Sequence, residues 1–351
     1  MSTYIIILGV IFIFAILNAY ITNKIQFVTK IFVLEFFLLF LLSGLRYEVG
    51  FDYGSYKDLY SCSSTLYEMK ELGFITLIEI FNKLHLPFEI FILIFAGLTV
   101  FFAFRFILKY SPYVFISILI YYSIGNFYFS SFNAVRQALA TAIFFNAFTF
   151  IQKRQFLRYS AVILLISVII HASAILLLPI YFYLTKEWKF KHQAMIAIII
   201  FSFSSVFITI IQHSPYAAYL KFDVFADAVP PTYYFLGLIS LLTFGYAFSN
   251  KKWASNHTLI LNINYIAFVL IVLDFIFENT PLVMVLNRLL GYFTLIYIVL
   301  IPMLLSEIKL FHNKIIAIII TCSLFFCLAY LALDSNGKKN QMVPYKTIFT
   351  E

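Results

Sequence analysis

Residues 31–56 read IFVLEFFLLFLLSGLRYEVGFDYGSY, and this stretch holds the two features that decide the fold class. Its first part, Ile31–Leu45, is an apolar run with the composition of a membrane-spanning helix. Its second part, Arg46–Tyr56, carries an arginine, a glutamate, an aspartate and three tyrosines. Such groups are costly in lipid, so their clustering at the end of an apolar run indicates a site for charged chemistry. The alternative is an interfacial Arg–Asp pair with a belt of tyrosines.

The whole chain shares the composition of that first part. Its 351 residues are 63% hydrophobic and 11% charged, whereas soluble domains carry about 25% charged residues. We therefore predict an all-α, polytopic integral membrane protein of about 11–12 transmembrane helices, forming a single transmembrane domain over residues 1–351. The first span lacks a basic n-region and a small-residue cleavage site, which favours a retained helix over a signal peptide. The predicted spans cover about 4–20, 28–45, 87–108, 112–129, 133–151, 156–170, 172–184, 191–212, 231–249, 257–278, 284–305 and 313–333.

Charge and cysteine patterns argue against several classes of function. The formal net charge of +8 is spread over short loops without a basic tract, so no nucleic-acid partner is predicted. Cys62, Cys322 and Cys327 give no disulfide framework. The sequence has no HExxH motif, no paired cysteine motif, no DxD-like acidic pair and no glycine-rich phosphate loop. We therefore expect no metal ion, no other cofactor and no ATP-driven step.

Basic residues in the short loops set the expected orientation. All of the short loops with clustered basic residues fall on the cytoplasmic side if Phe156–Leu184 is a broken hairpin with His171 near its outer tip. A single span over the same residues would move the later groups to the other side, so the hairpin is the preferred interpretation. Three segments are then extracytoplasmic: the loop 46–86 with an amphipathic interfacial helix at Glu68–Lys83, the loop 213–230, and the C-terminal tail 334–351.

Three arginines stand on this outer face. Arg136 lies inside an otherwise apolar helix, where an arginine costs roughly 2.5–3.5 kcal/mol on insertion scales. It could pair with a carboxylate on another helix, and Arg288, near the outer end of its span, could snorkel to the interface. With few acids nearby, Arg46, Arg136 and Arg288 favour an anion site instead. Guanidinium groups bind phosphate oxygens bidentately, as a lipid-linked diphosphate would require.

Two side chains could act as a general base on the same face. Asp52 lies between Gly50 and Gly54, which permit a tight and exposed backbone that presents a carboxylate or simply makes a turn. His171 lies in the apolar sequence SVIIHASAILLLP. It could be a satisfied helix-contact residue, or a base or phosphate donor at a helix break.

The motifs resemble the EpsG family of polysaccharide polymerases, which are related to Wzy proteins. The stretch 46–56 is similar to the family signature R-x-x-x-G-x-D-Y-x-x-Y, and nearly the whole chain follows the family's motifs in order. The later elements are an F-N-x-x-R-Q-x-x-A pattern, a helix-embedded H-x-S-A, an Arg followed by Tyr-Phe, and a C-terminal Pro-Tyr. Their matching residues are Phe132, Asn133, Arg136, Gln137 and Ala140; His171, Ser173 and Ala174; Arg288, Tyr292 and Phe293; and Pro344 and Tyr345.

This resemblance implies a metal-independent glycosyltransferase similar to the GT-C class. Such an enzyme joins undecaprenyl-diphosphate-linked oligosaccharide units into capsular polysaccharide, exopolysaccharide or O-antigen at the outer face of a bacterial plasma membrane. The implied partners are a lipid-linked glycan donor and acceptor, membrane lipid, and proteins such as a chain-length regulator or a flippase. The catalytic residues are expected to be Asp52, His171 and Arg136, with Asp52 and His171 both open as the base. The substrate-binding residues are expected to be Arg46, Tyr53, Tyr56, Asn133, Gln137, Arg288 and Tyr345.

Other functions fit parts of the same pattern. An O-antigen-ligase-like transferase would have a nearly identical site. A lipid or glycan transporter would need a polar pathway open to both sides, whereas the polar residues here favour one face. A membrane O-acyltransferase acting through His171 would need a cytoplasmic donor route, and no polar cluster matches it there.

Overall fold

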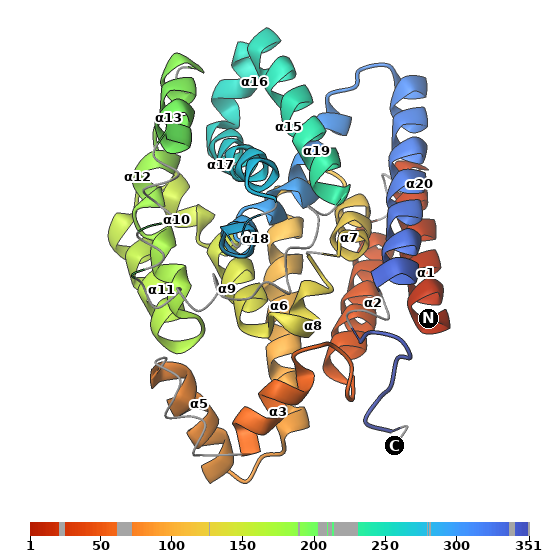
Figure 1. Cartoon of the computed structure of the whole chain (residues 1–351). Coiled ribbons are helices and arrows are strands. Elements are labelled where there is room, and N and C mark those ends of the chain that lie inside the picture. Colours follow the sequence, from red (N-terminus) through yellow and green to blue (C-terminus); the bar gives the residue numbers. More distant parts are fainter. Residues whose placement is uncertain are drawn as a thin grey trace. The chain divides into compact units, whose positions relative to one another are not determined.

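The computed structural model describes residues 1–20, 25–61, 72–125, 127–188, 190–202, 209, 213, 231–278, 280, 282–336 and 341–349. Within these ranges the regular elements are helices, and the one extended pairing is an isolated antiparallel bridge between Arg46 and Thr347 (Figure 1). The predicted all-α fold is therefore confirmed. Most of the loop 213–230 and residues 68–71 of the predicted amphipathic helix lie outside the described residues.

Several helices are long and apolar enough to cross a bilayer. Among the described residues these are Phe88–Tyr110, Thr232–Ser249, Thr258–Ile276, Leu282–Ser306 and Phe311–Asp334. Shorter apolar helices accompany them, for example Val114–Ser123 and Phe156–Ile169. The protein is thus a polytopic membrane protein, as predicted. The total of about 11–12 spans and the position of each loop relative to the membrane stay predictions.

The chain divides into two compact units. The first unit contains Met1–Pro179 and Ile298–Glu351, and the second contains Ile180–Tyr297. The helices of the first unit are α1 (Ser2–Tyr20), α2 (Ile25–Gly44), α3 (Tyr53–Ser61), α5 (Leu72–Lys83), α6 (Phe88–Tyr110), α7 (Val114–Ser123), α8 (Ser130–Asn133), α9 (Val135–Asn146), α10 (Phe148–Gln152), α11 (Phe156–Ile169), η1 (Ala172–Leu177), nearly all of α19 (Tyr297–Ser306), and α20 (Phe311–Asn336). The helices of the second unit are α12 (Ile180–Leu184), α13 (Phe190–Ser202), α15 (Pro231–Ser249), α16 (Lys251–Asn256), α17 (Thr258–Ile276), α18 (Leu282–Leu290) and η4 (Thr294–Ile296).

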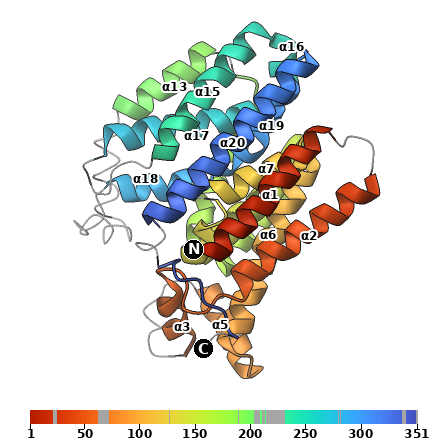
Figure 2. The same ribbon diagram turned by 90° about the vertical axis from the view of Figure 1, so that its right-hand side faces the viewer.

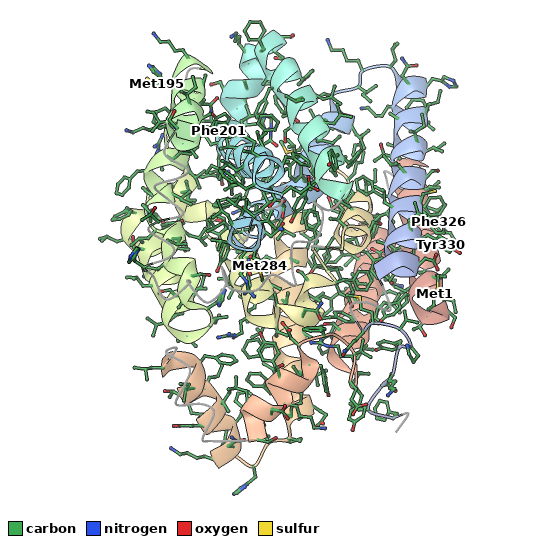
Figure 3. The ribbon with its side chains drawn as sticks, viewed as in Figure 1. Met1, Met195, Phe201, Met284, Phe326 and Tyr330 are labelled. Carbon is green, nitrogen blue, oxygen red and sulfur yellow. The ribbon has the colours of Figure 1, made fainter. Side chains whose placement is uncertain are left out.

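Within the first unit, α1, α7 and α20 pack side by side (Figure 2). The Tyr122 hydroxyl donates to the Tyr4 carbonyl at 2.9 Å, which ties α7 to α1. Phe326 of α20 packs its ring 5.0 Å from that of Phe12, while Tyr330, one turn further along, is exposed (Figure 3). An exposed aromatic residue on an otherwise apolar helix suits a lipid-facing side.

Two predicted spans, 112–129 and 133–151, are interrupted in the structure. Helix α7 ends at Ser123, and Ile124 is extended at φ −88° and ψ 114°. The chain then makes the single turn of α8 and breaks again at Ala134 before α9 begins. Arg136 therefore lies in the first turn of α9, rather than a full turn inside a continuous helix. The sequence 124–134, IGNFYFSSFNA, predicts a turn near Asn126–Arg136 through its glycine, asparagines and serines, but it does not fix where each helix ends.

The predicted break at His171 is present. Helix α11 ends at Ile169, His171 is extended at φ −157° and ψ 111°, and η1 follows. The Tyr159 hydroxyl donates to the Leu177 carbonyl at 2.6 Å, so η1 runs back beside α11. The predicted broken hairpin is confirmed to this extent. Its position relative to the outer face of the membrane stays a prediction.

The second unit is held together by polar side chains in an apolar interior. The Ser240 hydroxyl of α15 donates to the Asn264 amide oxygen of α17 at 2.9 Å and lies 2.6 Å from the Tyr297 hydroxyl. The Asn262 amide donates to the Lys186 carbonyl at 2.8 Å. Interhelical hydrogen bonds of this kind are a common means of helix association in membranes.

Candidate functional site

The C-terminal segment lies along the first motif. The Tyr47 amide donates to the Lys346 carbonyl at 3.0 Å, and the Ile348 amide donates to the Leu45 carbonyl at 3.1 Å. These bonds flank the bridge between Arg46 and Thr347. The Tyr345 hydroxyl also donates to the Leu42 carbonyl at 2.9 Å. The terminal Pro-Tyr element and the first motif, about 300 residues apart in the sequence, therefore belong to one local structure.

Arg46 is buried and holds backbone carbonyl groups. Its side chain is 2% exposed. One terminal nitrogen donates to the Ser43 carbonyl at 2.6 Å and to the Ser43 hydroxyl at 3.1 Å. The other donates to the carbonyls of Ser131 and Phe132 at 3.4 and 3.5 Å, and the guanidinium lies 4.8 Å from the centre of the Phe132 ring. Burial lowers the pKa of Arg46 to about 10, so the group stays charged at neutral pH. A phosphate could reach it only by displacing these contacts, and phosphate binding by Arg46 stays a prediction.

Gly50 makes the junction between the first and second motifs. Its φ of +103° is rarely adopted by other residues, and a Cβ there would lie 2.5 Å from the Phe132 carbonyl oxygen. The next amide, that of Phe51, donates to the side-chain oxygen of Asn133 at 2.7 Å. The glycine of the first motif and the asparagine of the second are thus parts of one contact.

Asp52 and its tyrosines follow directly. Asp52 is half-buried at the beginning of α3, and its carbonyl accepts from the Tyr56 amide at 3.0 Å. Tyr53 is buried, with its ring centre 5.3 Å from that of Phe88. Burial first, and then the Glu89 carboxylate, raise the pKa of Tyr53 to about 12, although Arg46 opposes them. Tyr53 therefore packs inside the unit as a neutral phenol, whereas Tyr56 is half-buried at its edge.

Arg136 is half-buried, in contrast to Arg46. Its guanidinium carbon lies 4.7 Å from the centre of the Phe74 ring, in cation–π geometry. Its neighbour Gln137 is buried. Phe74 belongs to α5, whose Gly73 approaches α11 so closely that a Cβ there would lie 2.0 Å from the Val168 carbonyl oxygen. The second motif is thereby linked to the segment that leads into His171.

One apolar cluster joins these motif residues, and we call it the aromatic cluster. Ile170, immediately before His171, packs against it, and His171 itself is half-buried. The structure therefore gathers the chain segments that carry Asp52, Arg136 and His171 around one apolar core, and their predicted roles in catalysis stay predictions. The buried members of the aromatic cluster are Tyr53, Tyr60, Phe74, Ile75, Ile78, Phe88, Phe91, Ile92, Phe95, Val135 and Leu139.

Arg288 belongs to the second unit. It is exposed in the last turn of α18, and the side-chain oxygen of its neighbour Asn287 is buried without a hydrogen-bond partner among the described residues. The predicted role of Arg288 in binding a diphosphate stays a prediction. Within the described ranges, no group of three metal-ligating side chains occurs.

Sequence reasoning missed two buried carboxyl groups. Glu35 of α2 and Asp274 of α17 are fully buried, and in the described part of the chain neither carboxyl group has a hydrogen-bond partner. The sequence carried the signal, because Glu35 is the one acid in the predicted span 28–45, and Asp274 lies inside the predicted span 257–278, which ends at Glu278. An intramembrane acid is a functional candidate by default, and these two were read only as part of the apolar helices.

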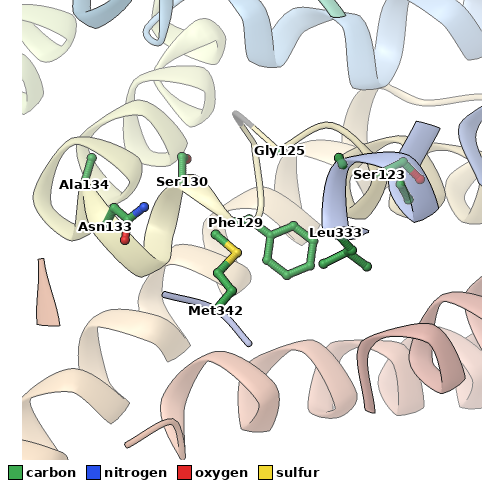
Figure 4. A pocket seen from close by; sticks show the side chains of 10 residues that line it. Ser123, Gly125, Phe129, Ser130, Asn133, Ala134, Leu333 and Met342 are labelled. Carbon is green, nitrogen blue, oxygen red and sulfur yellow. The ribbon is translucent and has the colours of Figure 1, made fainter. Parts of the chain in front are cut away.

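A cavity adjoins the junction of the motifs. Its volume is about 310 Å³, and its lining comes from the end of α7, the turn through α8, helix α20 and the C-terminal segment (Figure 4). Asn133, which accepts from the Phe51 amide, is one of its lining residues. The lining residues within the described ranges are Ser123, Gly125, Phe129, Ser130, Asn133, Ala134, Ala329, Ala332, Leu333 and Met342.

Comparison with known families decides the relationship. The model of the EpsG family matches residues 29–347. The chain belongs to the EpsG family. This EpsG family protein is accordingly a multi-pass membrane protein of a family implicated in exopolysaccharide biosynthesis. No curated protein and no solved structure matches the chain.

Proposed function

We propose that this EpsG family protein is a glycosyltransferase that joins lipid-diphosphate-linked oligosaccharide units on the extracytoplasmic face of the plasma membrane. The observation that carries the proposal is the junction of the two motifs, in which the Phe51 amide donates to the Asn133 side chain at 2.7 Å. This bond brings the beginning of α3, with Asp52, to the beginning of α9, with Arg136. A candidate base and a guanidinium therefore extend from one rigid core.

Arg136 is the group that we assign to the diphosphate. It is half-buried and stacked on Phe74, which fixes the direction of its guanidinium. Negative charge grows on the diphosphate as the glycosidic bond breaks. A guanidinium already in place stabilises that charge more in the transition state than in the ground state.

The reaction is a direct displacement at the anomeric carbon of the donor. A hydroxyl oxygen of the acceptor glycan forms the new bond, while the bond to the diphosphate oxygen breaks and its electron pair leaves with the diphosphate. The hydroxyl proton passes to the Asp52 carboxylate or to the His171 ring. Direct attack inverts the anomeric centre, and the diphosphate leaving group supplies the driving force without ATP.

Arg46 has a different role in this proposal. Its donors already hold the carbonyls of Ser43, Ser131 and Phe132. We assign it to positioning, because these contacts fix the Phe132–Arg136 turn relative to the first motif. Tyr345 contributes to the same task through its bond to the Leu42 carbonyl.

The test replaces Arg136 with alanine and follows polymer length on cells and with purified protein supplied with lipid-linked repeat units. Arg105→Ala is the matched control, since Arg105 is an exposed arginine of α6. We expect Arg136→Ala to lower polymerisation about 100-fold at unchanged membrane abundance, as for loss of one electrostatic donor. If the Arg136→Ala protein makes polymer of normal length, the proposal is wrong. Transfer to a lipid-free acceptor, in place of growth of the lipid-linked chain, would favour the ligase instead.

A further inference from the structure

The cavity beside the motif junction holds polar groups that lack partners. The Ser123 hydroxyl is buried at the end of α7 and has no hydrogen-bond partner among the residues that the structure describes. Asn133 gives its oxygen to the Phe51 amide, and its amide nitrogen makes no hydrogen bond within the described part of the chain. Both residues line the cavity (Figure 4). A buried polar group is normally paired, so a ligand with hydroxyl groups would satisfy Ser123, and the amide nitrogen of the half-buried Asn133 could donate to the same ligand.

The rest of the lining restricts the charge and shape of that ligand. Among the residues that the structure describes, no charged side chain lines the cavity, so these residues offer nothing to balance a phosphate. Gly125, Ala134, Ala329 and Ala332 leave space, and Phe129 adds apolar surface. An isoprenoid chain would fill this space but would leave the Ser123 hydroxyl unpaired. A pyranose ring carries both hydroxyl groups and an apolar face, and it matches both kinds of lining.

We propose that this cavity is a subsite for one neutral sugar ring of the glycan, separate from the groups that hold the diphosphate. The inference rests on the proposed function for the identity of the glycan. Its geometric basis is the bond from the Phe51 amide to Asn133, which connects the cavity wall to the residue before Asp52. A sugar seated here is therefore held next to the candidate base.

The experiment measures saturation-transfer NMR signals from methyl hexopyranosides, including methyl N-acetylglucosaminide, on the full-length protein in detergent. Ala332→Phe fills the cavity from α20, and Leu331→Phe is the control, because Leu331 is exposed on the same helix. We expect at least one hexoside to bind the unchanged protein and the Leu331→Phe variant, and its signal to vanish with Ala332→Phe. Ser123→Ala, which adds no volume, is expected to weaken that binding about fivefold, as for one lost hydrogen bond.

Three outcomes would overturn the inference: no hexoside binds, Ala332→Phe and Leu331→Phe bind alike, or inorganic pyrophosphate displaces the sugar. Loss of binding of farnesol, rather than of a hexoside, in Ala332→Phe would assign the cavity to an isoprenoid chain and would also overturn it. The proposed function is tested separately. Arg136→Ala should stop polymerisation while leaving hexoside binding intact, so failure of either proposal is visible without the other.

Discussion

The two motif arginines of the first unit, Arg46 and Arg136, both lie over a phenylalanine ring but differ in burial and in their contacts with the backbone. Arg46 is 2% exposed and donates to carbonyl and hydroxyl oxygens of Ser43 and to two carbonyls of the second motif. Arg136 is half-buried and lies over the ring of Phe74. Arg46 therefore holds the backbone of the two motifs together, whereas Arg136 is the arginine that we propose for the diphosphate. A motif arginine is not by itself a substrate ligand, and burial separates the two roles.

The largest expected effect is a loss of stability on replacing Gly50, the glycine of the motif that begins with Arg46. Gly50→Ala places a Cβ 2.5 Å from the Phe132 carbonyl oxygen at a φ of +103°. Strain and overlap together should lower the free energy of unfolding by about 3–5 kcal/mol. Thermal unfolding in detergent and membrane abundance measure the loss.

Gly54→Ala is the control for Gly50→Ala. Gly54 lies in α3, and a Cβ there would meet no atom within 4 Å. This variant should be stable, or more stable by about 0.5–1 kcal/mol, because alanine favours a helix over glycine. Equal behaviour of the two variants would contradict the tight junction between the motifs.

Exchange of each arginine for lysine sharpens the comparison directly. Arg46→Lys keeps the charge but loses the fork that reaches Ser43 and Phe132 together, which should cost about 2 kcal/mol of stability. Arg136→Lys should change stability by less than about 0.5 kcal/mol and instead lower the turnover of lipid-linked substrate. Unfolding curves and turnover per folded molecule separate the two. If the Arg46→Lys protein is stable but has low turnover, Arg46 binds the substrate rather than positioning the backbone.

The sequence predicted the helical class and the break at His171 better than it predicted local geometry. The membrane requires apolar spans and biases the charges of the loops along the whole chain, so both patterns can be recognised in the sequence. The break at Ala134 and the burial of Arg46 depend on contacts with Phe132 and with the C-terminal segment, and such contacts leave no periodic signal. The cavity likewise depends on the packing of α20 against α7, which no motif records.

A smaller effect is expected from Glu35, a buried acid on α2, the helix that leads to Arg46. Glu35 of α2 is fully buried, and among the described residues its carboxyl oxygens lack hydrogen-bond partners. Glu35→Leu should therefore raise the free energy of unfolding by about 1–3 kcal/mol and leave polymer length unchanged. Asp274→Leu is the parallel change in the second unit. If Glu35→Leu folds normally but makes no polymer, the carboxyl group has a function that the motifs do not reveal.

The smallest effect is a pH dependence at the motif junction. Tyr53 ionises in the folded protein at a pKa of about 12, above its ordinary value of 10.0. The folded state therefore keeps a proton that the unfolded state loses, so the stability from Tyr53 is complete below pH 10 and is lost as the pH rises toward 12. Arg46 works in the opposite direction, because its pKa is lowered to about 10 and its folded form releases a proton first. Tyr53→Phe should remove only the downward contribution, so its melting temperature should fall less steeply with alkaline pH than that of the unchanged protein. Parallel curves for the two proteins would mean that the Tyr53 phenol is not buried in the folded state.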